Sequence, residues 1–419
     1  MHKSEKESLA SAKRQLRAQK RQLKAEQKQR AKVLQQQKKN SARLNAKTTK
    51  QIKQLQAPKT AADCLQWQAM YENGICEIEP GLYSMTLRFS DVNYQIAHRE
   101  EQANIFTRYC ELLNYCDPDM HLQINLITQH MDQEQFRQDM FFPLLGDDKD
   151  LYRKEMNKVI ADAAMQGQNG LVREKFLTIS VKADSYDVAV QQLNRRAADM
   201  KSAFKGLHST ATVLTGKQRL ALINGIVRPG VPLHFDYDWL LAEKNLTAKD
   251  FVAPSSFDWQ PQHDDSRAVY RDRYAAGDMI GKTIFLRDLA PEMTDDLLSM
   301  LAELPFDLVV SLHVDAMEQH EAVELVKTKL AFMRQEESDG MVRAVRQHLP
   351  AAMGVRYELS ENIKNAEELL DELMNRNQKL FKTCLMIHTS ADTNTELDSR
   401  IKQIMSTVQK KTCRADTLP

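Results

Sequence analysis

The sequence lacks the long apolar stretches and the cysteine pairs that mark membrane-spanning and disulfide-bonded proteins. Its best apolar stretch, residues 306–314, contains Asp307 and His313 and is shorter than the roughly 18–20 residues of a membrane span. The basic amino terminus is followed by no apolar stretch, so a signal peptide is not expected. The 6 cysteines of the 419-residue chain have no repeated spacing, which favours free thiols in a reducing cytoplasm.

The sequence also lacks the spacings of the common metal and nucleophile sites. It has no Cys-x-x-Cys pair, and His121 and His130 are nine positions apart, so the spacing of a tetrahedral zinc site is missing. The acidic pairs at 147–148 and 264–265 lack the ligand pattern and turn glycine of a calcium loop. His388 lies in an apolar segment, where a hydrogen-bonded histidine is a better interpretation than a metal ligand. We therefore predict no metal ion, cofactor or catalytic residue in this chain.

Charge is distributed unevenly along the chain. Residues 1–56 hold 17 Lys and Arg but 3 Asp and Glu, a net charge of +14, whereas the remaining residues carry −13. These 56 residues contain no Gly, Pro, Phe, Tyr or Trp and consist mostly of good helix formers, which predicts a long basic helix over residues 1–57. We call residues 1–57 the arm. Its electrostatic surface is expected to include Lys13, Arg14, Arg17, Lys20, Arg21 and Lys24.

The composition of the arm indicates which kinds of surface it can contact and gives no indication of a catalysed reaction. Its charge can hold it against anionic lipid headgroups, nucleic acid or an acidic partner. The missing aromatics argue against base stacking and leave contacts with phosphate. Leu9, Leu16 and Leu23 recur every seven residues, but one sparse stripe makes a poor coiled-coil seam. A solvated leader without a partner explains the same composition, so these interpretations stay open.

Short apolar strands alternate with amphipathic helices after residue 63, which predicts an α+β fold. We expect a first α+β unit over residues 58–224, a Pro-rich and aromatic connector over 225–278, and a second α+β unit over 279–419. In the first unit the pattern predicts paired strands at 81–89 and 94–97, further strands at 121–128, 175–181 and 211–214, and helices at 99–116, 132–142, 149–166 and 185–204. In the second unit it predicts strands at 282–287, 307–314, 383–388 and 412–418, helices at 294–303 and 395–410, and a long pair of helices over 318–377.

The two units resemble each other in element order and in sequence. A constant offset of 208 positions matches Leu177, Ile179 and Asp184 to Leu385, Ile387 and Asp392. Ser185 and Thr393 follow the two aspartates, and these positions suit the caps of the helices that come next. We therefore expect two ferredoxin-like α/β sandwich units with a possible internal duplication, preceded by the long basic helix. The general demands of a strand, a cap and a helix are a simpler explanation of the same likeness.

One segment, residues 276–283, imitates a phosphate-binding loop. Gly281, Lys282 and Thr283 end a stretch that matches a relaxed form of the loop's pattern, with Ala276 in place of its first glycine. A working loop leads directly into a helix whose amino terminus faces the phosphate. Residues 284–286 are Ile-Phe-Leu and predict a strand instead. We interpret the three residues as a decoy, with Lys282 in solvent at the end of a sheet.

Several short motifs resemble those of a known family. They are Asn73-Gly-Ile-Cys76, Tyr83 and Asp91-Val-Asn-Tyr-Gln95, then Gly281-Lys-Thr-Ile-Phe-Leu-Arg-Asp288, and finally Ile387-His-Thr-Ser-Ala-Asp392. In order and spacing they resemble the amino-terminal region of conjugal-transfer ATPases of the TraE/TrbE-like class. Such ATPases belong to type IV secretion systems on mobile genetic elements of Gram-positive bacteria. The likeness covers about residues 60–415.

The resemblance implies a docking and assembly region that lacks its motor. In this family the amino-terminal α+β region binds inner-membrane channel subunits and helps the protein to form a ring, at the cytoplasmic face of the membrane. A motor that uses ATP and Mg²⁺ follows it, and this sequence stops at Pro419, about where the motor begins in the family. The resemblance thus implies a role in DNA transfer and no ATPase activity in this chain alone.

Two other interpretations stay open. In one, the chain is a nucleic-acid-binding protein that acts through the basic residues of the arm. In the other, it is a nucleotide-binding enzyme that uses Lys282 and Thr283.

Overall fold

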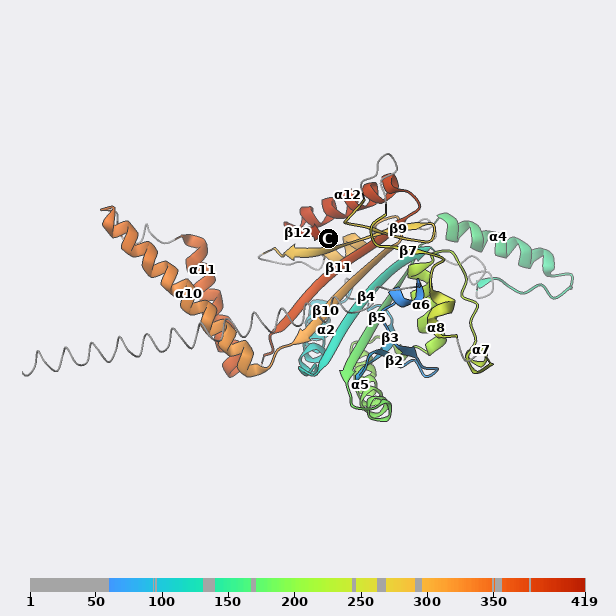
Figure 1. Ribbon diagram of the computed structural model, residues 1–419, viewed down its shortest axis with the longest axis horizontal. Coiled ribbons are helices and arrows are strands. Elements are labelled where there is room, and N and C mark those ends of the chain that lie inside the picture. Colours follow the sequence, from blue (N-terminus) through green and yellow to red (C-terminus); the bar gives the residue numbers. More distant parts are fainter. Residues whose placement is uncertain are drawn as a thin grey trace, which may run out of the picture. The chain divides into compact units, whose positions relative to one another are not determined.

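The computed structural model describes residues 60–92, 94, 96–130, 140–166, 171–242, 246–261, 269–290, 296–348, 350, 356–376 and 378–418. The chain divides into two units, residues 1–59 and residues 60–419, and the elements labelled in Figure 1 belong to the second. The predicted helix of the arm lies outside the described residues, as does most of the predicted helix over 132–142.

The fold is α+β and is built on one large antiparallel sheet (Figure 1). Within the described residues the sheet has 12 strands in the order β1-β2-β3-β5-β4-β10-β11-β9-β8-β7, with β6 beside β3 and β12 beside β9. The strands are β1 (Ala69–Met70), β2 (Cys76–Glu79), β3 (Leu82–Phe89), β4 (Met120–His130), β5 (Leu171–Lys182), β6 (Ala211–Val213), β7 (Phe257–Asp258), β8 (Tyr274–Ala276), β9 (Met279–Asp288), β10 (Leu308–Ala316), β11 (Phe381–Ala391) and β12 (Arg414–Thr417).

Helices connect the strands. They are α2 (Arg99–Asn114), α4 (Asp150–Gln166), α5 (Tyr186–Gly206), α6 (Gly216–Val227), α7 (Tyr237–Ala242), α8 (Ala248–Val252), α9 (Asp296–Ala302), α10 (Gln319–Arg346), α11 (Tyr357–Asn375) and α12 (Asn394–Lys410). Helices α5, α6 and α12 begin at residues whose side chains cap them. The Ser185 side chain accepts a hydrogen bond from the Val188 N–H at the start of α5, and Thr393 does the same for the Glu396 N–H at the start of α12. Both predicted caps are confirmed.

The strand order is the same when read from either edge of the sheet to its middle. The order from one edge inward is β1, β2, β3, β5 and β4. The order from the other edge inward is β7, β8, β9, β11 and β10. The last strand of each series returns to the same place, since β6 lies beside β3 and β12 beside β9. The two series meet at the antiparallel pair β4–β10, where Leu122 lies opposite Val314 and Leu126 lies opposite Val310. We call this pair the seam.

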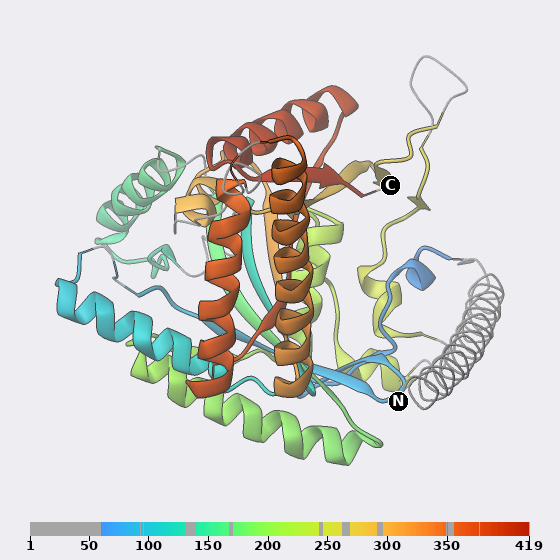
Figure 2. The same ribbon diagram turned by 90° about the vertical axis from the view of Figure 1, so that its left-hand side faces the viewer.

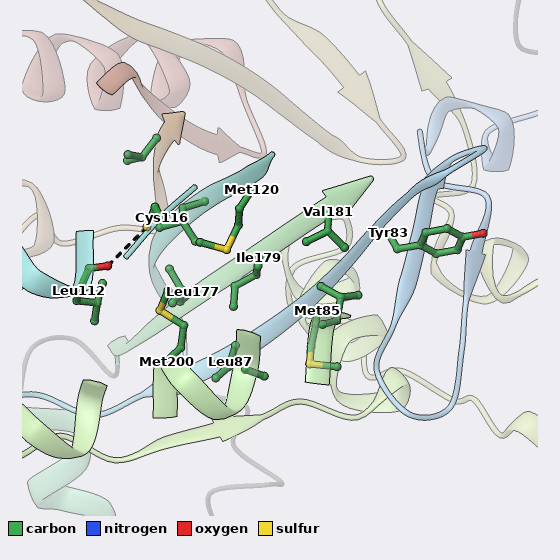
Figure 3. Packing of buried hydrophobic residues seen from close by; sticks show 14 of the residues in the cluster. Tyr83, Met85, Leu87, Leu112, Cys116, Met120, Leu177, Ile179, Val181 and Met200 are labelled. Atoms are coloured by element: carbon green, nitrogen blue, oxygen red, sulfur yellow. Dashed lines mark hydrogen bonds between the residues drawn. The ribbon is translucent and has the colours of Figure 1, made fainter. Parts of the chain in front are cut away.

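Two hydrophobic cores lie on one face of the sheet. Helices α2 and α5 pack on the first core (Figure 3), whose members include Met85, Leu122, Leu177, Ile179, Leu193 and Met200. Helices α9 and α12 pack on the second core, whose members include Ile284, Leu301, Val310, Ile387, Leu397 and Ile404. Each core also receives a side chain from across the seam, Val314 in the first and Leu126 in the second. Because residues paired in neighbouring strands point to the same face, both cores share that face.

Residues 216–252 lie between the two series of strands in the sequence, and α6 packs on strands of both. Leu222 and Ile226 of α6 cover the other face of the sheet at Ile127, Phe176 and Val309. Residues of α6 and α8 also form a small core with β1 and β2. The boundary that the sequence predicted at residue 224 falls inside α6, and β7 and β8 of the predicted connector pair into the sheet.

One predicted strand pair is wrong. Residues 94, 96 and 97 form turns and bends, and β3 pairs with β2 before it in the sequence. The reason is the two-residue turn Pro80-Gly81, in which Gly81 has φ 84°, a conformation that glycine adopts without strain. The other strands and helices predicted within the described residues are present, with ends that differ by a few residues.

Candidate interaction site

The decoy residues Gly281, Lys282 and Thr283 lie inside strand β9. Lys282 pairs with Thr389 and Thr283 pairs with His388 on β11, so the two side chains point to opposite faces of the sheet. They cannot hold one phosphate together. The strand also continues to Asp288, at the place where a phosphate-binding loop would start a helix.

Lys282 is not in solvent, so that expectation is wrong. Its residue is 6% exposed, and its Nζ forms a salt bridge with Asp272. Asp272 also contacts Arg273 at 3.2 Å, and Arg273 reaches Asp398 of α12 at 2.9 Å. Burial alone would raise the pKa of Asp272, but the bonds from Lys282 and Arg273 hold that pKa below its ordinary value. The network ties the β8–β9 hairpin to α12, which is a structural role.

Thr283 and His388 form a second, uncharged group on the opposite face of β9. The His388 Nδ1 lies 3.2 Å from the Thr283 hydroxyl, and its Nε2 lies 3.3 Å from the Tyr274 hydroxyl. The Tyr274 ring stacks on the imidazole with centroids 5.8 Å apart. Burial lowers the pKa of His388 to about 4 and raises the pKa of Tyr274 to about 12. Both groups are therefore neutral at pH 7, as suits a hydrogen-bonded core histidine.

A histidine pair lies at one end of the seam. His121 of β4 contacts Asp315 of β10 through Nδ1 at 2.5 Å, and its Nε2 lies 3.2 Å from the Nδ1 of His313. Burial, together with the neighbouring His121, lowers the pKa of His313. Among the described residues, no group of three or more His, Cys, Asp or Glu side chains is placed to hold a metal ion.

Two hollows of different size are found in the described part of the chain. An open one of about 340 Å³ lies on α10 and is lined by residues that include Glu324, Lys327 and Phe332. A cavity of about 20 Å³ lies between α6, the seam and β11, and the buried Thr128 hydroxyl beside it has no hydrogen-bond partner. This volume holds about one water molecule. In the same part of the chain, no helix is long and apolar enough to cross a membrane.

Two helical insertions stand out from the sheet. Each lies between the innermost strand of its series and the next strand, α4 between β4 and β5, and α10 with α11 between β10 and β11. Because β4 and β10 run antiparallel, the chain leaves them toward opposite ends of the sheet (Figure 1). Figure 2 shows α10 and α11 side by side as a hairpin.

The α4 insertion exposes many large apolar side chains. Between residues 140 and 159, eight of them are 49–70% exposed: Met140, Phe142, Leu144, Leu145, Leu151, Tyr152, Met156 and Val159. Apolar side chains gathered on this scale mark a contact surface more often than scattered single residues do.

The α10–α11 hairpin has a small apolar core of its own. Ala322 and Val326 of α10 and Leu373 of α11 form its core, where α11 also contributes Leu369 and Leu370. Exposed apolar residues of α10 include Leu325, Phe332, Val342 and Val345. The insertions are therefore the candidate interaction site, and α4 is the more apolar of the two.

Sequence reasoning missed this site because periodicity alone does not tell which way a helix faces. Tyr152, Met156 and Val159 recur at spacings of four and three, the pattern of a helix face that packs on a core. The exposure of that face depends on the rest of the fold. The residues chosen for the arm lie outside the described residues.

No known protein family matches the chain, and no curated protein matches its sequence.

Proposed function

We propose that the chain is a docking and assembly module of a conjugal-transfer ATPase of a type IV secretion system, non-catalytic by itself. The proposal rests on the short motifs of the sequence and on the helical insertions at the two ends of the sheet. The observation that carries it is the apolar surface of α4, since a module that serves assembly needs such a surface and an enzyme needs a pocket.

The strand order supports two ferredoxin-like units within this module. Such a unit runs β-α-β-β-α-β, with its four strands side by side in the order 4-1-3-2. The order β6-β3-β5-β4 has this form, and so does β12-β9-β11-β10. Asp184 lies between β5 and α5, and Asp392 lies between β11 and α12, as the offset of 208 positions requires. We infer a duplication in which each copy acquired a different helical insertion.

The proposed partners are inner-membrane channel subunits and further copies of the protein in a ring. The proposed location is the cytoplasmic face of the membrane, where the basic arm contacts anionic lipid or DNA. ATP and Mg²⁺ would belong to the motor of a full-length family member. Neither alternative function gains support from the described residues. The arm lies outside them, and Lys282 and Thr283 point to opposite faces of a strand.

Deleting the gene from the mobile element that encodes it tests the proposal. We expect transfer of the element's DNA to a recipient to be lost, and a plasmid copy of the gene to restore it. A copy with Thr283→Val should restore transfer equally well, because the hydroxyl of Thr283 bonds to His388 and holds no Mg²⁺ in this proposal. Undiminished transfer from the deletion strain contradicts the proposal. Loss of transfer with Thr283→Val in an otherwise folded protein favours the nucleotide-binding alternative.

A further inference from the structure

Helix α4 directs a row of large apolar side chains to the surface. Tyr152, Met156 and Val159 lie on one face and are 51–70% exposed. Its polar residues Arg153 and Asn157 turn instead toward the preceding segment of the chain and are less exposed. A globular protein normally buries the apolar face of a helix and exposes the polar one. We therefore expect another segment of protein to bind to the outward apolar face.

Hydrogen bonds fix α4 in this orientation. Asn157 accepts from the Phe142 N–H at 2.8 Å and donates to the Phe142 carbonyl at 3.0 Å. Asp150 accepts from the Leu145 and Gly146 N–H groups at 3.0 and 2.7 Å. Arg153 forms salt bridges with Asp147 and Asp150, and its bonds lower the pKa of Asp147. The apolar face thus points outward because the polar face is already engaged.

Acidic residues border the apolar face at a regular interval. Asp148 lies just before α4, and Glu155 and Asp162 follow at steps of seven residues, all three exposed. The exposed Lys154 and Lys158 lie on the side of these acids that is away from the apolar face. Glu155 is three residues from Tyr152 and four from Val159, so it lies beside the apolar face. An occupant that fits this surface has an apolar stripe with basic residues along one side, repeated every seven residues.

The arm of this chain carries that pattern. Leu9, Leu16 and Leu23 repeat every seven residues, and Lys6, Lys13 and Lys20 precede them by three positions each. On a helix, residues three apart are neighbours, so each lysine would flank its leucine. The stripe is too sparse to pair with a copy of itself, and the charge of +14 opposes such pairing. An apolar surface with an acidic border supplies the apolar area that a second sparse stripe lacks, and its acidic residues attract the positive charge of the arm.

We propose that residues 6–23 of the arm dock on the outward face of α4 in a second copy of the chain. The leucines would cover Tyr152, Met156 and Val159, and the lysines would meet Asp148, Glu155 and Asp162. The contact is heterologous, so each copy offers one arm and one α4, and copies join head to tail. This inference rests on the proposed assembly role and names the contact that would serve it.

A charge exchange in the full-length chain tests the contact. Three variants are compared with wild type by mass measurement in solution over a range of concentrations at low salt: Glu155→Lys with Asp162→Lys, Lys13→Glu with Lys20→Glu, and all four changes together. These side chains of α4 are exposed, so the fold should tolerate the changes. Glu358→Lys with Glu368→Lys on α11 is the matched control, since both are exposed acids of another helix.

Wild type and the α11 control should self-associate as concentration rises, and the first two variants should need at least tenfold higher concentration. The fourfold variant should regain association, because the exchanged charges attract again. If the wild type stays monomeric at every concentration, the inference is overturned. This holds both for an arm that binds α4 of its own chain and for an arm that binds nothing. Failure of the fourfold variant to recover also overturns it. Loss of DNA transfer on gene deletion would leave the proposed function standing in either case.

Discussion

Ile124 of β4 and Leu312 of β10 lie directly opposite each other at the centre of the seam. The pairs Leu122–Val314 and Leu126–Val310 flank them at equal distances along the strands. The first pair lies in the first core and the second pair lies in the second core, so each core takes side chains from both series. An axis between Ile124 and Leu312 would exchange the two series of strands, as the proposed duplication requires. The two cores are therefore coupled through a continuous hydrogen-bonded ladder.

Truncations in the two cores should affect one and the same unfolding transition. Leu193 of α5 and Leu397 of α12 are both fully buried, one in each core. Leu193→Ala and Leu397→Ala should each lower the free energy of unfolding by about 2–5 kcal/mol. Because the seam joins the cores, calorimetry and urea unfolding should show a single transition that moves in both variants. Two transitions, each moved by one variant alone, would show that the halves unfold separately.

Acid should destabilise the fold through His388. Burial lowers its pKa to about 4, while an unfolded histidine has a pKa of about 6.5. The unfolded chain therefore binds more protons between these values, and the free energy of unfolding falls as the pH drops from about 6.5 toward 4. The loss is at most about 3 kcal/mol.

Urea unfolding at pH 7 and pH 5 measures this loss. In a His388→Gln variant the difference between the two pH values should be smaller than in wild type. His320→Gln is the control, because the side chain of His320 is 90% exposed. An equal pH dependence in wild type and His388→Gln would show that His388 is protonated without cost.

Much of the fold could be predicted from the sequence because its signals are local. Alternating residues such as Leu122 and Leu126 mark a strand, and Ser185 and Thr393 mark the helix starts. The partner of β3 was predicted wrongly, because the predicted strand began at Gly81, which is a residue of the turn that joins β2 to β3. Likewise, no local signal shows that the strands of the two series join at a seam.

The site was less predictable than the fold because it depends on long-range contacts. Lys282 looked solvated from its neighbours in sequence, but Asp272, ten residues earlier, reaches it across the β8–β9 hairpin. The apolar face of α4 looked like a core face, and the direction in which it points is set by bonds such as that from the Phe142 N–H to Asn157. Whether a charge is buried and whether an apolar face is exposed depend on the whole fold, so neither could be predicted from the local sequence.

The arm should bind anionic surfaces by charge alone. With a net charge of +14 and no aromatic residue in residues 1–56, binding to duplex DNA or to anionic vesicles should weaken steeply as salt rises. Deleting residues 1–56 should abolish this binding and leave the circular dichroism of the body unchanged. Titrations at 50 and 200 mM salt measure the effect. Equal binding by the truncated chain at low salt would place the binding surface on the body.

The purified chain is expected neither to bind ATP tightly nor to hydrolyse it. Phosphoryl transfer needs a lysine and a Mg²⁺ ligand held together against the terminal phosphates. Lys282 is instead bound to Asp272 on one face of β9, and Thr283 is bound to His388 on the other. Lys282→Ala should therefore lower the free energy of unfolding, by about 1–3 kcal/mol, since it removes one of the two cations that pair with Asp272 and leaves Arg273 alone beside it.

Calorimetric titration with ATP and Mg²⁺ separates this structural role of Lys282 from a catalytic one. Wild type, Lys282→Ala and the milder Thr283→Val should all show no heat of binding at micromolar ATP. Thr283→Val retains the salt bridge of Lys282 and keeps the strand, so it controls for loss of stability in the lysine variant. Micromolar binding by wild type that both variants lose would mean that β9 opens to hold phosphate. That result would favour a nucleotide-binding enzyme over a docking module as the function of the chain.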